Sequence, residues 1–241
     1  MNKNDIELKF LANMPVSVKN ICKIHVPTLR EIIEMGEAKY HRMLSSLLLK
    51  REMLNVDESI EATNMEVTYI NCYHNREFKE VFEEASKLIF KEKIFMSPEE
   101  LGFFFYFGEL EEERIVTSED FDFIQSLVVV SNNIDVEGDD YNPANEEARK
   151  LVEEIKKAKA EITKNKKQIS SLASKISGVA WKSHNVNIFD VFDLNIYQFY
   201  DALWRLEQVD NYQFTLTGIY TGNIDNKKVK IDNLHWTKKI G

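Results

Sequence analysis

The chain has few of the residues that make tight turns and cross-links. Its 241 residues include four prolines, eight glycines and two cysteines. Immunoglobulin-like sandwiches need many turns, and secreted disulfide scaffolds need many cysteines, so this composition argues against both classes. A scarcity of turn residues favours long helices instead.

Long hydrophobic runs are also missing. The longest apolar run, Phe103–Phe107, is five residues long, whereas a membrane-spanning helix needs roughly 18 apolar residues. Met1–Asn13 is charged and lacks the apolar centre of a signal peptide. We therefore expect a cytoplasmic protein with no membrane partner, in which Cys22 and Cys72 are reduced and act as small hydrophobic residues.

The negative charge of the chain is concentrated in one stretch. The formal net charge is -9, and Glu99–Asp140 holds thirteen acidic residues against one basic residue, Arg114. Two interpretations stay open: solvated acidic loops around a core, or an acidic surface that meets a basic partner or repels nucleic acid. Asn145–Lys167 carries eight Lys or Arg against five Glu. That balance does not suit a surface that follows phosphates, so we expect no nucleic-acid partner.

Motifs of known catalytic sites are absent from the sequence. None of the five histidines lies in an H-E-x-x-H pattern or at a zinc-type spacing from a cysteine, and no Walker loop, G-x-S-x-G or G-x-G-x-x-G occurs. We expect no enzyme activity, no metal and no cofactor. One rival remains: a small enzyme or nuclease that uses the carboxylates of Glu109–Asp140. It predicts a metal-dependent activity that is lost on replacing Asp139 and Asp140.

Local signals predict several helices and one hairpin. Thr28 and Glu31 form a capping-box pattern at a helix start. Gly36 interrupts that helix, which predicts either a break between two helices or the close approach of another backbone. Phe103–Phe107 reads as a buried strand that pairs with Arg114–Thr117. Further helices are predicted over Glu77–Phe90, Ser118–Ser131, Ser170–Ser183 and Asn195–Tyr212.

The most informative segment is Tyr141–Gln168, which reads as a long, highly charged helix. Its apolar residues recur at spacings typical of a coiled-coil seam. A helix with so little apolar surface gains little stability alone. We therefore expect either a solvated connector or a surface for another protein. The seam consists of Leu151, Ile155, Ala158, Ile162 and Ile169.

These patterns together predict the fold class and the domains. We expect a mainly α-helical protein with a minor β-hairpin element, built as a helical bundle with one long, partly exposed amphipathic helix. Residues 1–20 should form a loose N-terminal arm, 21–134 an N-terminal helical domain with a short hairpin, and 135–144 a linker. Residues 145–241 should form a C-terminal helical domain with an aromatic-rich core.

Aromatic and seam residues are the candidates for partner binding. Each aromatic has two interpretations, a packed core residue or an exposed anchor, because Trp and Tyr dominate binding hot spots. A strand of consecutive aromatics places side chains on both faces, and an uncovered face would be adhesive. The candidate partner-binding residues are Phe103, Phe105, Phe107, Leu151, Ile155, Ile162, Ile169, Trp181, Trp204 and Trp236.

Five ordered motifs carry a resemblance to a known group of proteins. They are P-T-L-R-E-I-I-E-M-G-E-A-K-Y (27–40), Y-N-P-A-N-E-E-A-R-K (141–150), A-W-K-S-H-N-V-N (180–187), D-L-N-I-Y-Q-F-Y-D (193–201) and G-I-Y-T-G-N-I-D (218–225). From about residue 21 to 236 the chain resembles tail assembly chaperones of long-tailed phages and prophages of Gram-positive bacteria. No single motif contains catalytic or ligand residues, and their order and spacing carry the resemblance.

The resemblance implies a function and partners. Such chaperones bind the tape measure protein in the cytoplasm of the infected bacterium and help tail tube subunits to assemble around it. The tape measure protein and the tail tube protein are therefore the expected partners, with self-association as a further expectation. The alternative is a structural tail or connector component that is retained in the virion.

Overall fold

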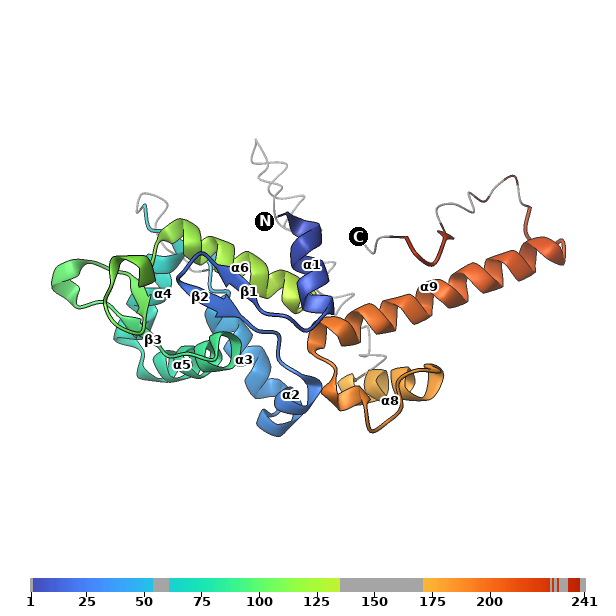
Figure 1. Cartoon of the computed structure of the whole chain (residues 1–241), viewed down its shortest axis with the longest axis horizontal. Helices are drawn as coiled ribbons and strands as arrows, with labels where there is room; N and C mark the ends of the chain where they lie inside the picture. Colours follow the sequence, from blue (N-terminus) through green and yellow to red (C-terminus); the bar gives the residue numbers. More distant parts are fainter. Residues whose placement is uncertain are drawn as a thin grey trace, which may run out of the picture.

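The computed structural model shows a mainly α-helical protein with minor antiparallel β-structure (Figure 1). It describes residues 2–53, 61–134 and 171–225, together with 227, 229 and 234–238. The predicted fold class is confirmed at this level, whereas the bundle arrangement and the division into domains stay predictions. No helix among the described residues is long and apolar enough to cross a membrane.

Most of the described helices and strands lie in one body formed by residues 2–53 and 61–134 (Figure 1). The α-helices there are α1 (Lys3–Leu11), α2 (Leu29–Met35), α3 (Glu37–Leu47), α4 (Asn64–His74), α5 (Arg76–Phe90) and α6 (Ser118–Ser131). The 3₁₀ helices are η1 (Arg51–Met53), η2 (Glu99–Leu101) and η3 (Glu112–Arg114). The strands are β1 (Val16–Val18), β2 (Cys22–Ile24), β3 (Ile94–Met96), β4 (Phe105–Phe107) and β5 (Ile115–Val116).

The strands form two small antiparallel sheets. β1 pairs with β2, and β4 lies between β3 and β5 in the second sheet. Phe105 is opposite Met96 on one side and Val116 on the other. The predicted hairpin between 103–107 and 114–117 is thus present in shortened form, and β3 adds a third strand that the sequence analysis did not predict.

The start of the chain differs from its prediction. We expect residues 1–20 to form a loose arm, whereas the described residues of this range form helix α1 and strand β1. Asn2 caps α1 by accepting a hydrogen bond from the Asp5 amide at 2.9 Å. The Phe10 ring is fully buried and lies 5.8 Å from the Tyr197 ring. Burial against α9 (Ile196–Tyr220) therefore fixes a helix whose own sequence shows little amphipathic pattern.

Gly36 separates two helices rather than admitting another backbone. The Thr28–Glu31 capping box is present at the start of α2, as predicted. Gly36 ends α2 with a φ of 92°, a backbone conformation that favours glycine. A Cβ built there would meet no atom within 4 Å. Of the two explanations that the sequence offered, the break between helices is right.

The remaining elements are α8 (Leu172–Lys182), η4 (Val191–Asp193) and α9 (Ile196–Tyr220). Buried side chains of α8 and of the first turn of α9, such as Val179 and Phe199, belong to the same hydrophobic cluster as the body. Beyond its first turns, α9 extends away from the body, and its outer end lies far from the other helices (Figure 1).

Candidate protein-binding surfaces

Helices α8 and α9 lie side by side and run in the same direction. The Lys175 ammonium lies 5.7 Å from the centre of the Tyr200 ring. Further along both helices, the Lys182 ammonium forms an ion pair with the Asp210 carboxylate. Both helices start with a side-chain cap: Ser171 accepts from the Ser174 amide at 3.1 Å, and Asn195 from the Gln198 amide at 2.8 Å. Local sequence thus fixes where each helix begins.

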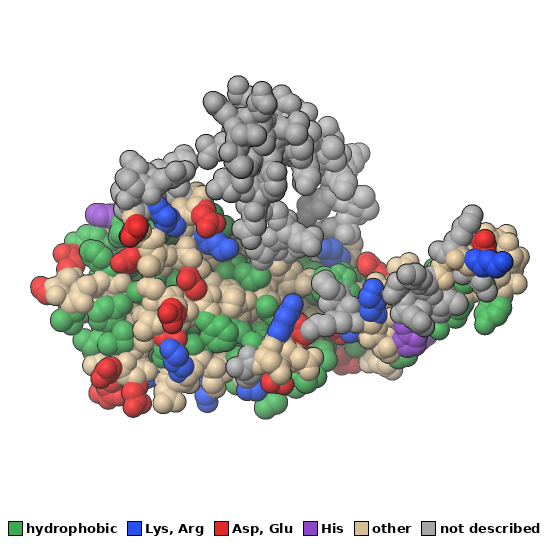
Figure 2. All heavy atoms as spheres, turned by 90° about the horizontal axis from the view of Figure 1, so that it is seen from above, with side chains coloured by type: hydrophobic (Ala, Val, Ile, Leu, Met, Phe, Trp, Pro, Cys, Tyr) green, Lys and Arg blue, Asp and Glu red, His purple; other side chains and the backbone are tan. Residues whose placement is uncertain are grey.

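These two helices and the loop between them expose large aromatic side chains. Trp181 at the end of α8 is 80% exposed, and Phe189 in the loop is also 80% exposed. On α9, Phe214 is 72% exposed and Tyr220 is 85% exposed. Hydrophobic side chains are visible at the outer end of α9 in the space-filling view (Figure 2). We call Trp181, Phe189, Phe214 and Tyr220 the aromatic surface.

The structure places the three predicted tryptophans differently. Trp181 is exposed, whereas Trp204 is partly buried, with its ring 6.4 Å from that of Tyr200. Trp236 is 45% exposed, and its ring stacks on His235 at 5.7 Å. The Arg205 guanidinium donates to the Trp236 carbonyl at 3.0 Å. Trp181 alone therefore presents nearly all of its ring to solvent.

The three predicted phenylalanines also differ in how exposed their side chains are. Phe105 and Phe107 are fully buried, because their rings pack against those of Phe82 and Phe90 at centroid distances of 5.1 and 5.0 Å. Phe103 lies just before β4 and is 48% exposed. Of these three candidates only Phe103 is accessible to a partner, since helices cover the face that Phe105 and Phe107 share.

Sequence reasoning missed Phe189 and Phe214 as surface residues. Phe214 lies on the side of α9 opposite the half-buried positions Val209 and Leu216. That position outside the apolar stripe is the signal that would have marked it. The other predicted candidates, Leu151, Ile155, Ile162 and Ile169, lie outside the described residues.

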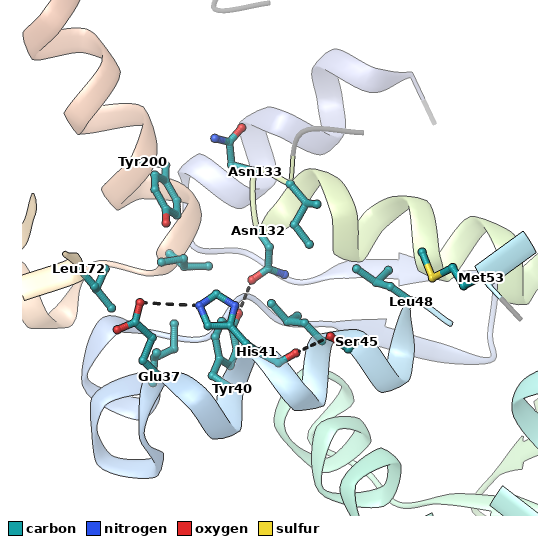
Figure 3. A pocket seen from close by; sticks show the side chains of 14 residues that line it. Glu37, Tyr40, His41, Ser45, Leu48, Met53, Asn132, Asn133, Leu172 and Tyr200 are labelled. Atoms are coloured by element: carbon teal, nitrogen blue, oxygen red, sulfur yellow. Dashed lines mark hydrogen bonds and ion pairs between the residues drawn. The ribbon is translucent and has the colours of Figure 1, made fainter. Parts of the chain in front are cut away.

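A cavity of about 450 Å³ lies where α3, the end of α6, α8 and α9 meet (Figure 3). Its lining is mostly apolar and includes Leu172 and Ile134. Tyr200 points into it from α9, and Tyr40 lies on its opposite wall (Figure 3). Pockets of this size commonly hold small ligands or apolar side chains.

The polar groups of this cavity are tied to one another. The Tyr40 hydroxyl donates to the Asn132 side-chain carbonyl, and the Asn132 amide donates to the Val128 carbonyl at 2.9 Å. Burial raises the pKa of Tyr40 well above its ordinary value. The His41 imidazole and the Glu37 carboxylate, 3.7 Å apart, lie at the more exposed side. Such a cavity suits an apolar group.

Both cysteines are buried and free. Burial is the main cause that raises the pKa of the Cys22 thiol to about 12, and the same holds for Cys72. Thiols are nucleophilic as thiolates, so neither is activated. Within the ranges that the structure describes, no three His, Cys, Asp or Glu side chains are grouped to hold a metal ion.

Comparison with protein families gives a match at the C-terminal end of the chain. Residues 163–241 match the family model of the YomV second domain, a phage-associated family. No curated protein and no solved structure matches the chain. The matched region contains α8, α9 and the whole aromatic surface, and the match is consistent with a phage protein.

Proposed function

We propose that this protein is a non-enzymatic tail assembly chaperone of a long-tailed phage. It binds the tape measure protein in the cytoplasm of the infected bacterium and releases it to the growing tail tube. The resemblance carried by the five ordered motifs supports this function, and the phage-associated match over 163–241 agrees with it. In this proposal the chain acts by binding alone, and no covalent bond is made or broken.

The aromatic surface is the observation that carries the proposal. Four large aromatic side chains stand more than 70% exposed on α8, α9 and their connecting loop. Trp, Tyr and Phe supply large apolar area for few rotatable bonds, and they are enriched where proteins bind one another. An extended helix such as α9 also offers its surface over several turns, which suits a long client.

Co-expression with the tape measure protein of the same phage tests the proposal. We expect the wild-type chain to increase the soluble fraction of the tape measure protein. The triple variant Trp181→Ala/Phe189→Ala/Phe214→Ala should lose most of this effect. Because these side chains are exposed, their removal should change the free energy of unfolding by less than about 0.5 kcal/mol per site.

A matched control removes three exposed hydrophobic residues elsewhere. Leu8, Leu110 and Phe123 are 55%, 44% and 39% exposed on the body, and their triple alanine variant should keep the solubilising effect. Equal solubility of the tape measure protein with and without the chain would contradict the proposal. So would purified virions that contain the chain at a stoichiometric copy number, as a retained tail component requires.

A further inference from the structure

The body carries a second exposed apolar patch, at the end opposite to the outer part of α9. Ile70 and Tyr73 lie three residues apart on α4 and are 40% and 57% exposed. Leu101 and Phe103, in and after η2, are 57% and 48% exposed. The Phe103 ring lies 5.3 Å from the buried Tyr69 ring, which joins the two pairs. We call these four exposed side chains the α4–η2 patch.

The patch is held in place by hydrogen bonds beneath it. The Ser97 hydroxyl donates to the Gly102 carbonyl and accepts from the Phe104 amide at 3.1 Å. The Tyr69 hydroxyl donates to the Ser97 carbonyl at 2.7 Å and so ties α4 to the same turn. An apolar surface that is fixed before binding loses less conformational entropy when a partner arrives.

Acidic side chains border the patch. Glu99 and Glu100 are exposed in η2, next to Leu101. The Tyr73 hydroxyl hydrogen-bonds to the Glu99 carboxylate, which raises the pKa of Tyr73. On α4, Glu66 lies about one turn before Ile70 and two turns before Tyr73, and its carboxylate also accepts from Thr63 in the capping box. Hydrophobic and acidic side chains lie side by side at this end of the molecule in the space-filling view (Figure 2).

We propose that the α4–η2 patch binds a basic amphipathic helix of a partner protein. An apolar stripe on such a helix would cover Ile70, Tyr73, Leu101 and Phe103. Its flanking Lys or Arg side chains would meet Glu99, Glu100 and Glu66. Helices bind apolar surfaces through residues spaced three and four apart, and opposite charges at the rim fix the orientation and speed the encounter. The inference does not depend on which protein the aromatic surface holds.

A pair of labelled peptides tests the charge of the partner. One is a helical peptide with Leu at positions three and four apart and Lys elsewhere, and the other has Glu in place of Lys. Fluorescence anisotropy should show that the Lys peptide binds the full chain and the Glu peptide does not. Raising NaCl from about 0.1 to about 0.5 M should weaken binding, because salt screens the rim charges.

Variants locate the binding site. We expect Leu101→Ser/Phe103→Ser and, separately, Glu99→Lys/Glu100→Lys to weaken binding by about tenfold or more, which is about 1.4 kcal/mol. Glu34→Lys/Glu207→Lys changes the net charge equally at other exposed sites, and should stay within about twofold of wild type. The variant Trp181→Ala/Phe189→Ala/Phe214→Ala should bind the Lys peptide as the wild type does. A failure of the peptide-binding proposal can therefore be told apart from a failure of the proposed chaperone function.

One measurement needs no variant. Hydrogen exchange of the wild-type chain should show protection at 70–73 and 99–103 on addition of the Lys peptide. Equal weakening by both charge-reversal pairs would show that net charge alone attracts the peptide and would overturn the proposal. A concentration-dependent dimer that Leu101→Ser/Phe103→Ser abolishes in sedimentation would overturn it as well, since a second copy would then be the occupant.

Discussion

The side-chain amide of Asn195 donates to the main-chain carbonyl of Phe10 at 3.0 Å and so joins the start of α9 to the end of α1. Asn195 is fully buried, and its amide also donates to the Asn13 side-chain carbonyl at 2.9 Å. The side-chain carbonyl of Asn195 caps α9 by accepting a hydrogen bond from the Gln198 main-chain amide. One side chain thus serves a helix start and a contact between distant parts of the chain.

Replacing this residue should destabilise the whole protein. We expect Asn195→Ala to lower the free energy of unfolding by about 2–4 kcal/mol, because it removes a helix cap and the two buried hydrogen bonds that the Asn195 amide donates to Phe10 and Asn13. Urea unfolding followed by circular dichroism measures this loss. Asn185→Ala, at an exposed position, is the control and should cost less than about 0.5 kcal/mol. A similar cost for both variants would refute the assigned role.

Asp120 should make the free energy of unfolding depend on pH in the acidic range. Burial raises the pKa of its carboxyl, but hydrogen bonds from the Lys19 ammonium and the Thr117 hydroxyl outweigh burial and lower the pKa below 3.8. A lowered folded-state pKa contributes stability above the unfolded-state value, and this contribution is lost as the pH falls through the folded-state value. Asp120→Asn should therefore show a weaker loss of stability below about pH 4. Unfolding midpoints measured from pH 6 to pH 2 check it, and parallel curves for both proteins would contradict it.

The two cysteines should be unreactive in the folded protein. Burial raises the pKa of Cys22 and Cys72 to about 12, so thiolate is scarce at neutral pH and a reagent must first reach the core. A thiol-specific chromogenic reagent at pH 8 should modify neither residue within minutes. In denaturing urea both should react at once, giving two equivalents per chain. Rapid reaction of either thiol without urea would show that its part of the core opens readily.

Sequence patterns predicted those parts of the fold that local interactions determine. The Thr28–Glu31 box and the apolar stripe of α5 contain their own signals, because caps and 3.6-residue periodicity act within a few residues. The helix predicted over Ser170–Ser183 is also present, as α8. These elements needed no knowledge of distant contacts.

Long-range packing determines the parts of the fold that local sequence patterns did not predict. Helix α1 buries only Ile6 and Phe10, and Phe10 meets Tyr197 from the other end of the chain, so no local period marked it. The alternation along 103–107 predicted side chains on both faces of a strand. Which face is covered depends on distant helices such as α5, so Phe105 and Phe107 entered the core. Phe103 lies before β4 begins and stayed half exposed. The exposed aromatics of α9 depend likewise on where the body ends.

Because α9 extends beyond the body, a small rotation at its first turn displaces its last turn by a larger distance. Its 25 residues span about 37 Å at about 1.5 Å per residue. A tilt of about 10° at the base would swing the tip through about 6 Å. Helix α8 lies alongside α9 as far as the Lys182–Asp210 ion pair, so small changes where Asn195 meets Phe10 are magnified at Phe214 and Tyr220 when the two helices move together.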